Sequence, residues 1–364
     1  MTRIRRHNLD PSQWRPYALF LCLFLLAVTE GVVRGYQPHF LTQTSGLIEH
    51  KKALLNRPEP LAYDAIILGD SQILRVDATY MSEKISEALG RPFTVYNFAI
   101  PNHGLRTYPL LIKKYLAHHR KPQIILFAIP PIATTGEWSI HDSFERTSSL
   151  YSLAELYSLA ELSGRLPLKT FLAMVTIKVE SLSTLVLYRA RIRELLQNPN
   201  GENAERVRTQ HQQLKRYSGG HLTRLRVRMT PDELKTVKYY DWPVYPSPEA
   251  VSWYKEAFRT THDSGIQVLI ANTPLPEEIT RNRDRDGSTR RYADLITEFT
   301  TEFSNVEVLP PLVRPYSFDN FEDWHHVNQQ GAQRFIKELT HGFTAYLTTR
   351  DPGPDTPTAV PGRN

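Results

Sequence analysis

Cysteine is almost absent from this sequence: Cys22 is the single example in 364 residues. One cysteine cannot form an intrachain disulfide and cannot make up a zinc site built from cysteine ligands. The 26 prolines and 17 glycines follow no fixed period, which excludes a fibrous chain. The remaining composition, 41% hydrophobic and 23% charged, is typical of a globular protein of one to three domains.

A large excess of charge of one sign is also missing, because 44 lysines and arginines face 38 acidic residues. The net charge is +6, and the first 36 residues supply half of it. The other basic residues form no recognised nucleic-acid-binding module, so we expect no nucleic-acid partner. The charge of +3 in the N-terminal segment comes from Arg3, Arg5, Arg6, Arg15 and Arg34 against Asp10 and Glu30.

One long apolar run is present near the N-terminus. Its uninterrupted part, Tyr17 to Val28, has the length of a signal-peptide core, and extension to Val33 reaches the lower limit for a membrane-spanning helix. No small-residue cleavage site follows, so we predict an uncleaved transmembrane anchor within residues 1–36. The arginines before the run place the N-terminus in the cytoplasm. We therefore expect a single-pass inner-membrane protein whose later residues lie in the periplasm or another extracytoplasmic space.

Five short apolar runs predict buried strands. They are rich in Ile, Val, Leu and Phe without alternation, which is typical of parallel strands covered on both faces. Residues at helical spacing lie between them and again near the C-terminus, from Ala332 to Phe343. This alternation predicts an α/β fold with a central parallel sheet. The predicted strands are Ala65–Leu68, Phe93–Phe98, Ile124–Ile129, Val268–Ala271 and Val306–Leu309.

A stretch of some 130 residues, about 134–264, separates the third predicted strand from the fourth. It is too long for one crossover, and it contains the hexapeptide YSLAEL twice, at 151–156 and 157–162. We predict a mainly helical insertion, which either packs over the domain or contacts the membrane surface. The α/β domain would then span 37–345, followed by a disordered proline-rich tail at 346–364.

The tripeptide Gly69-Asp70-Ser71 follows the first predicted strand. The carboxyl end of a strand is where an α/β protein presents ligand-binding and catalytic groups. Gly69 would permit a tight turn, and Ser71 would lie at the N-terminus of the next helix, where backbone N–H groups can stabilise an oxyanion. Alternatively, Ser71 only caps that helix.

A second motif, Asp323-Trp324-His325-His326, precedes the C-terminal helical pattern. An aspartate three residues before a histidine can orient the imidazole, which then acts as the general base for a serine. The spacing favours His326 as the base and leaves His325 as a wall or substrate contact. A metal site at Asp323, His325 and His326 is disfavoured, because adjacent histidines diverge on most backbones.

Together these motifs make the chain similar to the SGNH/GDSL hydrolase superfamily. The nucleophile block matches Gly69-Asp70-Ser71, the D-x-x-H block matches Asp323 and His326, and the continuation matches Asn328 and Gly331. The resemblance implies a flavodoxin-like three-layer α/β/α sandwich, a Ser71–His326–Asp323 triad and no cofactor or metal.

The middle blocks depart from the family pattern. For the oxyanion hole, the resemblance implies the Ser71 N–H together with the backbone N–H of Asn102 or Gly104, and the sequence leaves that choice open. The third block, Gly-x-Asn-Asp in the family, reads Ala128-Ile129-Pro130-Pro131 here. Losing one oxyanion donor costs on the order of 100- to 1000-fold in rate, so another donor, for which the Asn102 side chain is a candidate, would have to replace the asparagine.

With this departure, the chain resembles the anchored SGNH-like proteins that work with membrane-bound O-acyltransferases on cell-envelope polysaccharides. It implies serine-dependent acyl transfer or ester hydrolysis on a glycan, with such an acyltransferase as a partner. The alternative is a non-catalytic accessory protein that retains the fold and binds a glycan or the acyltransferase.

Overall fold

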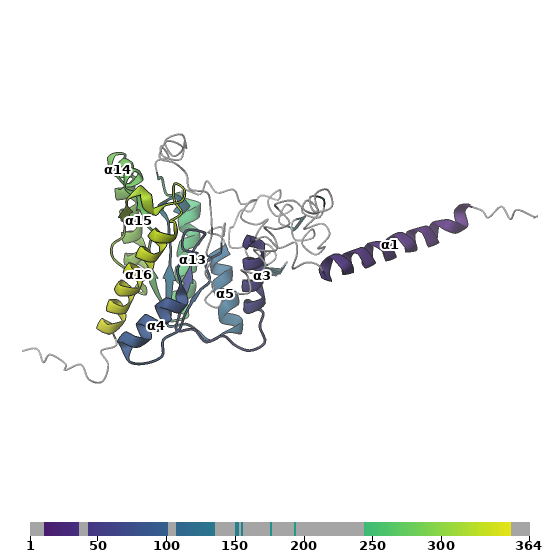
Figure 1. The fold of residues 1–364 in the computed structure, drawn as a ribbon, viewed down its shortest axis with the longest axis horizontal. Coiled ribbons are helices and arrows are strands. Elements are labelled where there is room, and N and C mark those ends of the chain that lie inside the picture. The colour runs from purple at the N-terminus through teal and green to yellow at the C-terminus, as the bar shows by residue number, and fades with distance from the viewer. Residues whose placement is uncertain are drawn as a thin grey trace, which may run out of the picture. The chain divides into compact units, whose positions relative to one another are not determined.

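The computed structural model (Figure 1) divides the chain into two compact units, Met1–Gly46 with Val175–Lys215, and Leu47–Met174 with Arg216–Asn364. The residues it describes are 11–35, 43–100, 107–134 and 244–350, with 150–152, 154–155, 175–176 and 193.

The N-terminal apolar run forms part of one continuous helix, α1 (Pro11–Gly35). Its large apolar side chains from Phe20 to Val32 are exposed, Phe20 most of all at 71%. Within the described part of the chain, no helix has both the length and the apolar character needed to cross a membrane.

All five predicted strands are present, and they form one sheet in the order β2-β1-β3-β4-β6. Every pairing in it is parallel; Ala65 of β1, for example, is in register with Val95 of β2 and Ile124 of β3. The predicted α/β fold with a parallel sheet is therefore confirmed. The strands are β1 (Ala65–Leu68), β2 (Val95–Asn97), β3 (Ile124–Phe127), β4 (Gln267–Ile270) and β6 (Val306–Val308).

The uninterrupted apolar sequences of β1 and β3 are explained by their central place in the sheet. Every residue of both strands is buried, as expected where helices cover both faces. Counted within this sheet, the order 2-1-3-4-5 is one of the two common orders of doubly wound sheets. Its topological switch point lies between β1 and β3, so the residues that follow β1 stand where such folds bind ligands.

Helices cover the two faces of the sheet as right-handed crossovers require. From β1 to β2 the chain moves across the sheet in one direction, and in every later crossover it moves in the other. This places α4 on one face of the sheet and α5, α13 and α15 on the other. The packing agrees, since α4 contacts α16, α13 contacts α5, and Phe258 of α13 meets Phe299 of α15 edge to face. The helices are α4 (Ala78–Leu89), α5 (Tyr108–His118), α13 (Pro248–Asp263), α15 (Ser288–Glu302) and α16 (Gln329–Arg350).

The last part of the predicted insertion is the regular helix α13, which packs on β4 and so serves as the crossover from β3. Residues 135–149 and 194–243, and most of those between, lie outside the described part, as do the second YSLAEL copy and residues 351–364. Helix α16 continues to Arg350, five residues past the predicted domain boundary. The other elements are α3 (Gln43–Leu55), β5 (Leu275–Pro276), α14 (Glu277–Arg285) and β7 (Pro315–Tyr316), with short 3-10 helices at Pro131–Thr134 and Phe318–Asn320.

Candidate active site

Ser71 lies in a turn that begins three residues after β1 ends, not at the start of a helix. The predicted position at a helix N-terminus is therefore wrong, and so is the alternative that Ser71 caps the helix. Helix α4 begins only at Ala78, and Asp77 is its N-cap. The Asp77 carboxylate accepts the backbone N–H groups of Thr79 at 3.0 Å and Tyr80 at 3.1 Å. An acidic cap is preferred at this position, which leaves Ser71 in a loop of its own.

Two buried polar side chains shape this turn. Asp70 accepts the backbone N–H of Gln72 at 2.8 Å, which bends the chain around Ser71. Asn97, at the end of β2, donates its amide hydrogens to the carbonyls of Ile73 and Val76, at 3.0 Å each. Burial raises the pKa of Asp70, against the opposing effects of the Gln72 N–H and of His326. The turn is thus held by Asp70, which follows β1, and by Asn97, which ends the neighbouring strand β2.

Gly69 is required by close packing. Its φ is not in the left-handed region, unlike that of Gly90. A Cβ atom at position 69 would lie 2.6 Å from the Ile73 Cγ2 and 2.9 Å from the Ala128 Cβ. The missing side chain therefore leaves room for Ile73 within the turn, and it also lets the turn approach Ala128 just after β3.

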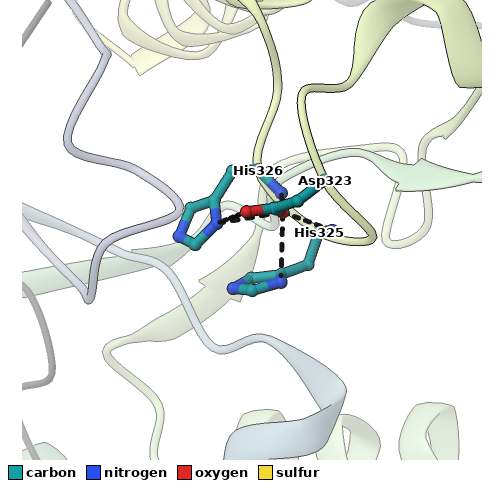
Figure 2. Close-up of side chains that lie close together, drawn as sticks. All are labelled: Asp323, His325 and His326. Atoms are coloured by element: carbon teal, nitrogen blue, oxygen red, sulfur yellow. Dashed lines mark hydrogen bonds and ion pairs between the residues drawn. The ribbon is translucent and has the colours of Figure 1, made fainter. Parts of the chain in front are cut away.

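The Asp323 carboxylate is bound from several directions at once. Its Oδ1 accepts the backbone N–H groups of His326 at 2.7 Å and His325 at 3.0 Å. The Nδ1 of His326 lies 2.8 Å from Oδ2 and 3.0 Å from Oδ1. The rings of His325 and His326 lie side by side, with centroids 3.7 Å apart. Figure 2 shows that the carboxylate lies beside both rings. The Nδ1 of His325 is 3.4 Å from Oδ1.

These contacts decide the charge of the aspartate. Burial by itself raises the pKa of Asp323, but the hydrogen bond from His326 and the charges of His325 and His326 outweigh it and hold that pKa well below its ordinary value. Asp323 is therefore ionised at neutral pH. An ionised partner at Nδ1 keeps a proton on that nitrogen and leaves Nε2 as the acceptor.

The Nε2 of His326 lies 2.8 Å from the Oγ of Ser71. The three residues singled out in two separate sequence motifs therefore form one hydrogen-bonded chain, from the serine hydroxyl through the imidazole to the carboxylate. This is the geometry in which an imidazole can take a proton from a serine.

The chain matches no protein-family model, and no curated protein is significantly similar to it. The parallel five-stranded sheet is compatible with the SGNH fold but is not specific to it.

The sequence continuation after His326 has a structural role. Asn328 accepts the Gly331 N–H at 3.0 Å, which caps helix α16, and donates to the Asp319 carbonyl at 2.6 Å. A side chain at Gly331 would collide with the backbone carbonyl of Asn320, and its Cβ would lie 2.9 Å from the Asn320 Cβ. Both residues thereby fix the loop that carries Asp323 and His326.

Asp323, His325 and His326 also form a group whose potential ligand atoms lie within 4.8 Å of one another. Both ring nitrogens of His326 are hydrogen-bonded, however, one to Asp323 and the other to Ser71. A metal ion at this place would have to displace one of those partners. The arrangement fits proton transfer better than metal ligation.

The predicted oxyanion residues Asn102 and Gly104 lie outside the described part of the chain. The region of the missing block-three asparagine is described, and Asn272, which no sequence motif marks, ties it to β4. Asn272 accepts the Ile129 N–H at 3.3 Å. Its amide hydrogens go to the Tyr292 hydroxyl at 2.6 Å and the Leu312 carbonyl at 2.9 Å. Because both are used, Asn272 is not the replacement oxyanion donor.

Other contacts near the site carried no sequence signal. Thr273 donates to the Gln72 side chain at 3.0 Å, directly beside Ser71. Arg75 forms a 2.6 Å ion pair with Glu322, beside Asp323. Single polar residues in loops fit no spacing rule, so their pairing could not be read from the sequence.

Proposed function

We propose that this protein is an SGNH-like serine enzyme that transfers or hydrolyses O-acyl groups on a glycan. The observation that carries the proposal is the hydrogen-bonded chain from Ser71 through His326 to Asp323. A buried carboxylate, an oriented imidazole and a serine in a loop after a central strand are the parts that nucleophilic acyl transfer requires.

The chemistry proceeds in two halves. The Ser71 Oγ attacks the carbonyl carbon of an ester while His326 Nε2 takes the hydroxyl proton. The tetrahedral intermediate collapses, the C–O bond to the alcohol breaks, and the leaving oxygen receives that proton from His326. A glycan hydroxyl or water then attacks the acyl-serine with His326 again as base, which releases the new ester or the acid and restores Ser71.

The family resemblance supports the finer parts of the proposal. These are a flavodoxin-like three-layer sandwich, an oxyanion hole from the N–H groups of Ser71 and of Asn102 or Gly104, and a cell-envelope polysaccharide as acceptor. A membrane-bound O-acyltransferase would supply the acyl group. The apolar run in α1 and the arginines around it support attachment to a membrane with the catalytic unit outside the cytoplasm.

A fluorophosphonate probe tests the proposal directly, because it reacts with an activated serine and needs no knowledge of the substrate. The full chain should be labelled on Ser71, as located by peptide mass spectrometry, and should hydrolyse p-nitrophenyl acetate. Ser71→Ala should lose both properties. Ser252→Ala, an exposed serine that bonds the Glu249 carbonyl on α13, should keep both.

The non-catalytic accessory reading is favoured by one observation: Pro130 stands where the family has its oxyanion asparagine. A proline has neither an amide side chain nor a backbone N–H to offer. A folded chain that binds an acetylated glycan but forms no fluorophosphonate adduct would support this reading and contradict the enzymatic one.

A further inference from the structure

Arg75 contacts the Asp–His loop at two points. It lies four residues after Ser71 in the same turn. Its Nη2 lies 2.6 Å from the Glu322 carboxylate, and its Nη1 donates to the Val327 carbonyl at 2.7 Å. Glu322 immediately precedes Asp323, and Val327 immediately follows His326. One guanidinium therefore holds the chain on both sides of the Asp–His pair.

The loop that Arg75 holds is closed on itself. The Glu322 N–H donates to the His326 carbonyl at 2.9 Å, and Phe321 forms an antiparallel bridge with Val327. A loop closed in this way moves as a unit rather than residue by residue. A displacement at Glu322 or Val327 is therefore passed to the imidazole of His326.

The ion pair is shielded from water. The side chains of Arg75 and Glu322 are 12% and 6% exposed. Burial raises the pKa of Glu322, while the Arg75 charge and its hydrogen bond oppose that rise. A buried pair is screened little by salt. The planar guanidinium can serve two acceptors in fixed directions, whereas a lysine ammonium is a single flexible point charge.

We propose that Arg75 is a positioning residue that sets the distance between Ser71 and His326. The inference rests on the proposed function, because the distance matters only if His326 takes the serine proton. A misplacement of about 1 Å costs on the order of 100-fold in rate. The two contacts described above join Arg75 to Glu322 and Val327, so the proposed effect acts through the loop.

Three variants of the full chain test this role. Arg75→Ala should slow fluorophosphonate labelling of Ser71 by about 10- to 100-fold and lower kcat for ester hydrolysis, with KM within about twofold. Arg75→Lys should recover part of the loss. The double variant Arg75→Ala/Glu322→Ala should label on Ser71 no more slowly than Arg75→Ala alone, because the two residues act as one unit. Lys84→Ala, which removes an exposed ion pair with Glu87, should label at the wild-type rate.

Labelling of Arg75→Ala at the wild-type rate would overturn the inference. So would an Arg75→Lys variant that labels no faster than Arg75→Ala, or a loss that appears in KM alone. If Arg75→Ala does not fold, Arg75→Lys and Glu322→Gln decide: slowed labelling at an unchanged melting temperature supports positioning, and wild-type labelling contradicts it.

Failure of the proposed function would look different, because the wild-type chain itself would then not label. In that case, amide hydrogen exchange decides on Arg75. Faster exchange in Arg75→Ala that is confined to peptides covering 69–76 and 321–328 would support the role of Arg75 in holding these two loops together. Unchanged exchange there, or faster exchange throughout the chain, would contradict it.

Discussion

The Nε2 of His326 lies 2.8 Å from the Oγ of Ser71, although 255 positions separate the two residues in the chain. Ser71 belongs to the turn after β1, and His326 to the loop before α16. Neither residue is held by a helix or strand of its own. Their approach depends on contacts between loops.

Asp323→Asn should slow Ser71 labelling by about 10⁴-fold, because an amide in place of the carboxylate favours the wrong imidazole tautomer. The folded pKa of Asp323 lies below its ordinary value, so its contribution to the free energy of unfolding is complete above about pH 5 and is lost as the pH falls further. Denaturant unfolding should show the stability gap between wild type and variant narrowing from about pH 5 to pH 2. A gap independent of pH would contradict the paired carboxylate.

Gly331→Ala should reduce the free energy of unfolding by about 1–3 kcal/mol, because the new Cβ collides with the Asn320 backbone. It should also slow labelling, since the loop carrying Asp323 must shift. Gly342→Ala in the same helix is the matched control. Its Cβ would make ordinary contacts with Leu309 at 3.7 Å, so the gain in helix propensity should stabilise the protein by about 0.5–1 kcal/mol. Equal effects of the two substitutions in urea unfolding would refute the steric argument.

Lys51→Met should stabilise the protein at neutral pH, because it removes the cost of keeping an ionisable group in the interior. Lys51 is fully buried and donates to the Ala99 carbonyl, and burial lowers its pKa well below the ordinary value. Between the lowered pKa of folded Lys51 and its ordinary value near 10.4, the unfolded chain therefore binds more protons than the folded chain, and wild-type stability should rise with pH through that range.

The pH series of unfolding curves should show this rise in the wild type and a smaller one in Lys51→Met. Lys52→Met changes the neighbouring, partly exposed lysine and should alter stability by less than about 0.5 kcal/mol. A destabilised Lys51→Met protein would show instead that the bond to Ala99 outweighs the cost of burial.

The full chain should stay in the membrane fraction after alkaline carbonate extraction, because the apolar side chains of α1 are exposed and burying them in lipid is favourable. Deletion of residues 1–36 should release an ectodomain that still labels on Ser71. Protease added from outside the cytoplasm should digest the catalytic unit in intact spheroplasts. Recovery of the full chain in the soluble fraction would exclude the proposed location.

The sequence alone determined the parallel sheet. Strands such as Ala65–Leu68 and Ile124–Phe127 are short, uninterrupted apolar runs, and such a composition predicts burial on both faces. It also singled out Ser71, Asp323 and His326, because two of these residues lie three positions apart and the third follows a strand. A local pattern suffices in such cases, since the cause acts within a few residues.

Only the tertiary structure decided what holds these residues in place. It moved Ser71 out of a helix start, gave Gly69 and Gly331 their steric reasons, and paired Arg75 with Glu322 across 247 positions. It also buried Lys51 in a helix where nothing in the sequence marks it. These features arise from contacts between loops far apart in the chain, where a charged or small residue has no repeat and no fixed spacing from its partner. Such contacts exist only after the sheet has brought the loops together.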